Sequence, residues 1–102
     1  MSYEVFNNKI AIVTGAASGL GQGFATQIDK AGGTVIAADI NLEGVKATVD
    51  SLSDRAEAHQ LDVASSEAVT KLVDDTVEKH GRIDYIFNNA GIAVGGPAEE
   101  IP

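Results

Sequence analysis

Cysteine and tryptophan are absent from this sequence of 102 residues, and aromatic residues make up only 5 % of it. Without a thiol, the chain can form no disulfide, no thiolate zinc site and no cysteine nucleophile. Two histidines are too few for a metal site unless carboxylates stand at a suitable spacing, and the sequence offers no such cluster. We therefore predict no metal site.

Basic residues and long apolar runs are also lacking. Seven Lys and Arg against fifteen Asp and Glu give a formal net charge of −8, so we expect neither nucleic acid nor an anionic membrane as a partner. No apolar run approaches the roughly 18 residues of a membrane span, and the N-terminus lacks the basic and apolar regions of a signal peptide. These absences predict a soluble, cytoplasmic protein.

What the sequence does contain is typical of one small folded domain, with 44 % hydrophobic and 22 % charged residues. Apolar, β-branched segments alternate with segments whose apolar residues have helical spacing. Strands are predicted at residues 9–14, 34–38, 56–61 and 83–87. Helices are predicted at residues 20–31 and 42–52, the second capped by Asn41, and from Ser65 or Ser66 to Gly81. This alternation predicts an α/β fold with a doubly wound parallel sheet and right-handed crossovers.

A glycine-rich turn at residues 14–21 joins the first strand to the first helix. Glycines at positions 15, 19 and 21 let the backbone turn sharply and approach a dinucleotide pyrophosphate closely. The N-terminus of the following helix would then offer N–H groups and a positive dipole end to that phosphate. A glycine-rich turn without a ligand is the alternative, whereas a P-loop is excluded because no Gly-Lys-Ser/Thr follows.

Asp39 closes the second predicted strand, 18 residues beyond Gly21. This is near the spacing at which an acidic residue meets the adenosine ribose of a bound dinucleotide. The carboxylate would accept hydrogen bonds from both ribose hydroxyls and repel a 2′-phosphate by roughly 4 kcal/mol per pair of unit charges about 4 Å apart. Asp39 therefore favours NAD over NADP, unless it serves only as a helix cap.

Together these motifs resemble the short-chain dehydrogenase/reductase family. The resemblance rests on the glycine spacing, on Asp39, on Asp62-Val63 after the third strand and on residues 88–91 (Asn-Asn-Ala-Gly) after the fourth. It covers nearly the whole chain from Lys9 onward. It implies a Rossmann-type sheet of about four strands in the order 3-2-1-4 with three helices, incomplete at its C-terminal side. We expect residues 1–102 to form a partial NAD-binding domain.

The resemblance also implies a role for each matching position. Asp39 would hold the adenosine ribose, and Asp62 with Val63 would bracket the adenine. Ser18 and Ile40 occupy positions where NADP-preferring members commonly carry a basic residue. Thr14 would bond the loop after the fourth strand and fix the centre of the sheet. The full set of implied coenzyme-binding residues is Gly15, Ser18, Gly19, Leu20, Gly21, Asp39, Ile40, Asp62, Val63, Asn89, Ala90 and Gly91.

Family chemistry implies a serine, an asparagine and a Tyr-x-x-x-Lys pair, which lie beyond the fourth strand. Here the two tyrosines, Tyr3 and Tyr85, are followed four positions later by Asn7 and Asn89, so we assign no catalytic residue. We therefore expect the coenzyme-binding segment of an NAD-dependent oxidoreductase that acts on an alcohol or carbonyl. The alternatives are a truncated, non-catalytic product that binds NAD or a longer homologue, and, more remotely, part of a class I methyltransferase.

Several residues also have purely structural interpretations. Asp62 could serve only its own turn, Asn88 is expected to be structural, and Tyr85 is expected in the core. Neither His59 nor His80 is a candidate base, and the acidic face of the third helix is expected to be solvated.

With one helix on the second face of the sheet, we expect the first and fourth strands to leave apolar surface and an open edge there. Such a surface favours instability or self-association.

Overall fold

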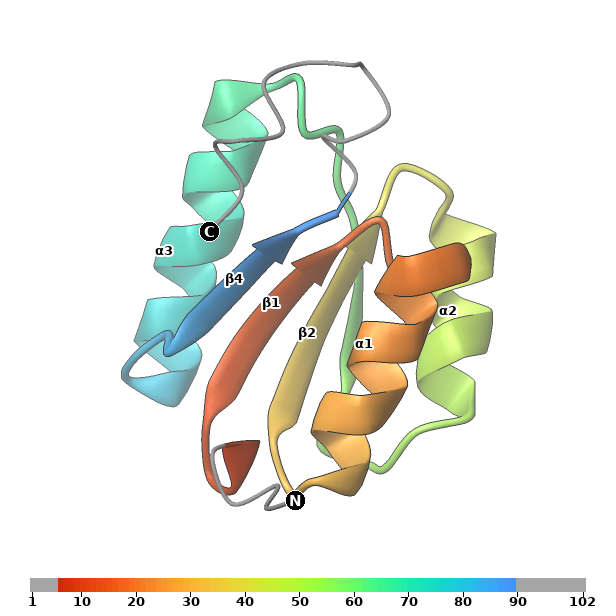
Figure 1. Cartoon of the computed structure of the whole chain (residues 1–102). Helices are drawn as coiled ribbons and strands as arrows, with labels where there is room; N and C mark the ends of the chain where they lie inside the picture. Colours follow the sequence, from red (N-terminus) through yellow and green to blue (C-terminus); the bar gives the residue numbers. More distant parts are fainter. Residues whose placement is uncertain (1–5, 90–102) are drawn as a thin grey trace.

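A computed structural model of the chain describes residues 6–89, which form one parallel sheet flanked by helices on both faces (Figure 1). In chain order the elements are β1 (Ile10–Thr14), α1 (Gly19–Lys30), β2 (Thr34–Asp39), α2 (Leu42–Asp50), β3 (Glu57–Gln60), α3 (Ser66–His80) and β4 (Tyr85–Asn88). The strand order is β3-β2-β1-β4. The predicted fold class and strand order are therefore confirmed.

β1 lies at the centre of the sheet because its side chains can be buried on both faces. Its sequence, Ile-Ala-Ile-Val-Thr, is buried at every position, as a continuous β-branched strand of a parallel sheet should be. It pairs in parallel with β2, where Ile12 lies opposite Ile36, and with β4, where Ile12 lies opposite Ile86. The central strand thereby fixes the register of both neighbours.

The helix boundaries follow the predicted capping residues. The Asn41 side chain accepts a hydrogen bond from the Gly44 amide at 3.0 Å, and the Ser65 hydroxyl accepts one from the Ala68 amide at 3.1 Å. α3 ends at Gly81, whose φ of 86° is the left-handed conformation that glycine adopts without strain. Asn41, rather than Asp39, therefore caps α2, and Ser65 rather than Ser66 caps α3.

The two faces of the sheet differ in how completely helices cover them. α1 and α2 cover one face, and their core includes Val13, Val35 and Ile28. α3 packs on the other face, over a second core that includes Ile36 and Leu72. The expectation of exposed apolar surface is confirmed for β4, where Ile86 is 45 % exposed, but it is wrong for β1, which is fully buried. β1 has a paired strand on each side, and the side chains of the second core under α3 are enough to cover its face.

No helix within residues 6–89 is both long enough and apolar enough to cross a bilayer.

Candidate coenzyme site at the carboxyl edge of the sheet

The predicted site residues lie at the carboxyl ends of four parallel strands. The glycine-rich turn follows β1, Asp39 ends β2, Asp62 follows β3, and Asn89 follows β4. Parallel strands bring these ends to one edge of the sheet, and β1 lies where the strand order reverses. In open α/β sheets, ligands bind in the crevice at this reversal point. The topology therefore gathers residues that are up to 74 positions apart in the sequence; for example, Gly15 and Asn89 share this edge.

The glycine-rich turn needs its glycines for two different reasons. Gly15 and Gly19 have φ values of 68° and 62°, in the left-handed region that side chains rarely adopt. Gly21 instead lies against the turn: an added Cβ would be 2.0 Å from the Gly15 carbonyl oxygen and 3.0 Å from Asn89 Nδ2. By contrast, nothing lies within 4 Å of a Cβ built on Gly19. The turn is thus closely packed at Gly21 and has open space at Gly19, as expected of a turn whose backbone binds a ligand.

The N-terminus of α1 is left without the groups that stabilise the other two helices. Ser18 precedes α1, but its side chain makes no capping hydrogen bond, and the first turn contains no acidic residue. α2 and α3 each have a side-chain cap and a glutamate in the first turn, Glu43 and Glu67 respectively. The first N–H groups of a helix have no partner within the helix, and they carry its positive dipole end. The α1 N-terminus therefore suits an anion.

Asp39 lies beside this turn and contacts it directly. Its Oδ2 accepts a hydrogen bond from the Ala17 amide at 3.0 Å, and its Oδ1 accepts one from the Asn41 amide at 2.9 Å. Each carboxylate oxygen can accept further bonds, so these contacts leave capacity for hydroxyl donors. Ile40, the next residue, is 63 % exposed at the same edge.

The remaining predicted residues differ in their surroundings. Leu20, which fits the apolar stripe of α1 in sequence, is 70 % exposed and so is not part of the core. Asp62 accepts a bond from the Ala64 amide at 2.9 Å, which is the turn contact considered from sequence. Val63 packs at the margin of the core under α3. Ala90 and Gly91 lie outside the described residues.

Thr14 was predicted to bond the loop after the fourth strand, and its described bonds reach instead the last two residues of β4 itself. Thr14 Oγ1 lies 3.0 Å from Asn88 Oδ1 and 3.4 Å from the Phe87 carbonyl oxygen, and donates toward both. Asn88 therefore has the structural contact expected of it. These bonds hold the end of β4 against β1, directly below Asn89.

Sequence reasoning missed two residues of α2 that support the turn from below. The buried Thr48 hydroxyl donates to the Ala16 carbonyl at 2.9 Å and accepts from Gln22 Nε2 at 3.2 Å. A Cβ on Gly44 would lie 2.9 Å from the Ala17 methyl group, so α2 can approach the turn only because this residue is glycine. The available sequence signal for this contact was the glycine inside a predicted helix. By itself such a glycine indicates only a cost to the stability of that helix.

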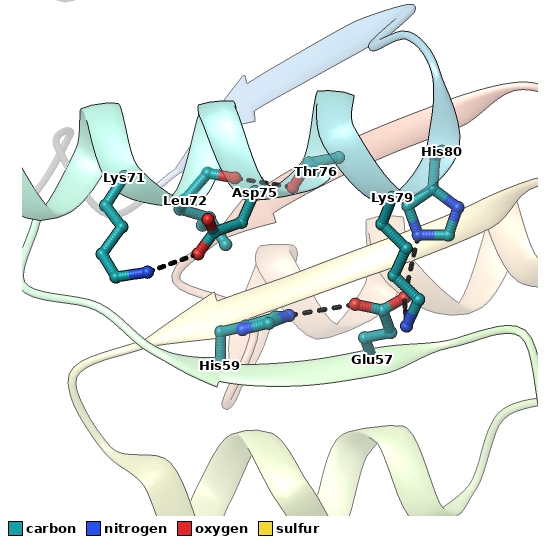
Figure 2. Close-up of polar contacts among 8 residues, drawn as sticks. All are labelled: Glu57, His59, Lys71, Leu72, Asp75, Thr76, Lys79 and His80. Carbon is teal, nitrogen blue, oxygen red and sulfur yellow. Dashed lines mark hydrogen bonds and ion pairs between the residues drawn. The ribbon is translucent and has the colours of Figure 1, made fainter.

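α3 runs antiparallel to the strands, so it ends where the strands begin. At these amino ends of the strands, opposite the candidate site, lies a polar cluster centred on Glu57. Its carboxylate contacts His80 Nε2 at 2.8 Å, His59 Nε2 at 3.1 Å and Lys79 Nζ at 2.7 Å (Figure 2). Burial acts to raise the pKa of this carboxyl, but hydrogen bonds from the lysine and the two histidines outweigh burial and lower the pKa to about 2. The cluster thus ties α3 to the edge strand, away from the candidate site.

A cavity of about 340 Å³ opens beside the candidate site on the α3 side of the sheet. Its walls include Ile12, Val73 and Ile86, with Thr14 and Asn88 at one end. This mostly apolar lining does not suit a phosphate, and of the glycine-rich turn only its first residue, Thr14, is among the walls. The cavity therefore belongs to the incompletely covered face and not to the anion site.

The comparisons with known proteins agree with this geometry. The sequence model of the family described as short chain dehydrogenase matches residues 9–102. The chain belongs to the short-chain dehydrogenase family. Similar members include a meso-2,3-butanediol dehydrogenase of Serratia marcescens, 40 % identical over 96 residues, and a D-threitol dehydrogenase of Mycolicibacterium smegmatis, 39 % identical over 98. Each alignment covers 93 % of this chain and 38 % of the relative.

Solved short-chain dehydrogenase structures share the fold. One from Mycobacterium smegmatis superposes with a TM-score of 0.79 at 36 % identity, over 86 % of this chain and 39 % of the other. A 3-ketoacyl-(acyl-carrier-protein) reductase from Brucella melitensis, complexed with NADH, gives a TM-score of 0.75 at 30 % identity, over 79 % and 33 %. The chain thus spans between one-third and two-fifths of the length of these proteins, and it contains the nucleotide-binding fold of a family that uses nicotinamide coenzymes.

Proposed function

We propose that residues 1–102 form a partial coenzyme-binding domain that binds NAD in preference to NADP, and that this domain serves an oxidoreductase acting on an alcohol or carbonyl. The observation that carries the proposal is the uncapped N-terminus of α1 beside a turn whose Gly21 touches the Gly15 carbonyl. An anion there would satisfy N–H groups that the chain leaves without a side-chain cap. When bound, NAD would accept a hydride from a carbinol carbon at its nicotinamide C4, and NADH would donate one from C4 to a carbonyl carbon.

Each part of the coenzyme would contact a different group of residues along the carboxyl edge of the sheet. The backbone of Ser18, Gly19 and Leu20 would bind the pyrophosphate. The Asp39 carboxylate would accept the ribose hydroxyls, with Ile40 beside the adenosine. Asp62 with Val63 would flank the adenine, and residues 89–91 would line the other side of the coenzyme. Asn89 Nδ2 supports this placement because it lies 3.0 Å from the Cβ position of Gly21, within reach of the same cleft.

The preference for NAD is proposed from the charge at Asp39 and from its uncharged neighbours. A 2′-phosphate placed against this carboxylate would be repelled, and Ser18 and Ile40 provide no positive charge to offset the repulsion. The methyltransferase alternative gains no support from the relatives reported above, which are dehydrogenases and a reductase. A non-catalytic, NAD-binding product would use the same coenzyme contacts.

Isothermal titration with NAD, NADP and S-adenosylmethionine tests the proposal, and two glycines of α1 provide a matched pair of variants. Gly21→Ala forces a Cβ against the Gly15 carbonyl, so we expect NAD affinity to fall at least about tenfold. Gly23→Ala meets nothing within 4 Å and should leave NAD affinity unchanged. Tighter binding of S-adenosylmethionine than of NAD, or equal effects of the two variants, would contradict the proposed site.

A further inference from the structure

The two oxygens of the Asp39 carboxylate bind backbone amides on opposite sides of the candidate site. Oδ1 accepts from Asn41, two residues later, in an ordinary local turn. Oδ2 accepts from Ala17, which lies 22 positions earlier, in the glycine-rich turn. The second bond joins the end of β2 to the segment that approaches the phosphate. Because this bond joins segments that belong to two different strand ends, local turn formation does not explain it.

Ala17 is the point where this turn is held from several directions. The preceding amide, that of Ala16, donates to the Ala38 carbonyl at 3.1 Å, and the Ala17 methyl group would lie 2.9 Å from a Cβ added at Gly44 of α2. The Asp39 carboxylate adds a charge-assisted bond to the Ala17 amide. Such bonds are shorter and about twice as strong as neutral ones. The carboxylate thus holds the turn just before Ser18 and Gly19, where the proposed anion contacts begin.

The other carboxylate at this edge serves as a natural comparison. Asp62 follows the neighbouring strand and bonds the Ala64 amide within its own turn. No bond from Asp62 to the glycine-rich turn occurs among residues 6–89. Asp39 ends the strand next to β1 and bonds the turn that follows β1, whereas Asp62 follows the strand beyond it and bonds only its own turn.

We propose that Asp39 is a positioning residue for the glycine-rich turn, in addition to the ribose contact proposed above. Its carboxylate would hold the Ala17 amide and so preset the shape of the anion site before any ligand arrives. This inference rests on the proposed function, because the shape matters only if the turn binds the pyrophosphate of a dinucleotide. It follows that replacing Asp39 should weaken the binding of the phosphates as well as that of the sugar. Removing this acid alone would therefore be a poor route to an NADP-binding variant.

The positioning role is tested on the whole chain without ligand, by NMR measurement of amide hydrogen exchange. In Asp39→Ala, we expect the Ala17 amide to exchange about tenfold faster or more, as for a lost bond to a charged acceptor. The Ala16 amide, bonded to Ala38, should change less than about twofold. Asp62→Ala, which removes the same charge from the same edge, should leave Ala17 exchange unchanged. An unchanged Ala17 amide in Asp39→Ala would overturn the inference.

Asp39→Asn provides a second variant in case the alanine variant folds poorly. An asparagine side chain has one carbonyl oxygen and an NH2 donor in place of two carboxylate oxygens, so the Ala17 and Asn41 amides can no longer bond separate oxygens as they do in Asp39. We expect faster exchange at one of these two positions. Protection of both amides at the level of the unchanged chain would overturn the inference.

Inorganic pyrophosphate then separates this role from ribose recognition, since it has no sugar. Losing a negative charge should by itself tighten pyrophosphate binding, and Asp62→Ala should show that effect. Asp39→Ala should instead weaken binding at least about threefold, as followed by chemical-shift titration. Tighter binding in both variants would overturn the positioning role. If the unchanged chain binds no pyrophosphate, the proposed function fails, while the exchange measurement still decides the contact to Ala17.

Discussion

The two faces of the sheet differ most clearly at β4, whose successive side chains point to opposite faces. Toward α1, Phe87 stacks on Phe24 with ring centroids 5.4 Å apart, and Tyr85 meets Phe6 edge-on at 5.3 Å. Toward α3, Ile86 is 45 % exposed and lines two cavities, of about 340 and 670 Å³. Tyr85 therefore packs among aromatic rings at the margin of the core, but it is only half-buried, so the expectation of a core aromatic is met only in part.

This difference matters for function because the candidate site lies above the well-packed face. α1 supplies the N-terminus proposed to bind an anion, and α2 supports the turn through Thr48 and Gly44. On the face under α3, the bond from Thr14 to Asn88 is the one described contact of the glycine-rich turn, and α3 itself has none among the described residues. Its exposed apolar residues, Ile86 and Val77, remain the basis for the prediction that the chain self-associates or is unstable.

The largest expected effect comes from a matched pair of isoleucines, one on each face. Ile28 of α1 is 1 % exposed, so Ile28→Ala should lower the free energy of unfolding by about 3 kcal/mol, through lost burial and a cavity. Ile86→Ala should lower it by less than about 1 kcal/mol, because much of that side chain already contacts water. Urea denaturation at several protein concentrations measures both values. A loss at Ile86 as large as that at Ile28 would mean that something covers β4 in solution.

A buried threonine on each face gives the next comparison. Thr48→Val removes the donor to the Ala16 carbonyl, and we expect a loss of about 1–2 kcal/mol in unfolding free energy. Thr76 of α3 donates to the Leu72 carbonyl at 2.7 Å within its own helix, and that carbonyl keeps its helical N–H partner after Thr76→Val. We expect Thr76→Val to change stability by less than about 0.5 kcal/mol. Equal effects would show that the contact to the turn contributes nothing beyond local helix structure.

The smallest effect concerns the Glu57 cluster that holds α3 to the edge strand. Because the pKa of Glu57 falls from 4.5 to about 2 on folding, its charged form stabilises the fold above about pH 4.5. That contribution is lost as the pH falls toward 2. Glu57→Gln should lower the unfolding free energy by about 1 kcal/mol at pH 7, after allowance for solvent screening. It should also flatten the pH dependence between 4.5 and 2.

Asp75→Asn is the control for this prediction. Asp75 forms an exposed pair with Lys71 at 2.7 Å on the outer face of α3 (Figure 2), and such i,i+4 pairs contribute about 0.3–0.5 kcal/mol. Thermal melts of both variants from pH 2 to 7 provide the measurement. A pH profile that is the same for Glu57→Gln and the unchanged chain would contradict the role assigned to the cluster.

Local signals were enough to predict most of the elements. Asn41, Ser65 and Gly81 cap helices in the structure because capping depends on a side chain and on backbone amides within four residues of it. The alternation of strands and helices likewise predicted a parallel sheet, since crossovers have a fixed hand. Leu20 shows the limit of such patterns: it fits the apolar stripe of α1 in sequence, yet it is 70 % exposed.

The candidate site could be predicted in its components but not in its internal contacts. The glycines and Asp39 stand out by spacing, because a dinucleotide needs close backbone approach and a sugar contact at a fixed distance along the fold. The bond from Asp39 to Ala17 and the support from Thr48 gave no such signal. Both join segments that are at least 22 positions apart, and many other pairs in the sequence have equally suitable chemistry.

By itself, the sequence determined the family, the order of the elements and the edge of the sheet at which polar residues gather. The family follows from the resemblance of four motifs along the chain, and the order of the elements follows from periodicity and capping, which act over a few residues. Only the tertiary structure decided which apolar side chains are covered and which polar groups meet. Ile12 and Ile86 belong to similar strands, yet one is 2 % and the other 45 % exposed. Burial depends on what packs against a residue from elsewhere in the chain, and no local pattern records that neighbour.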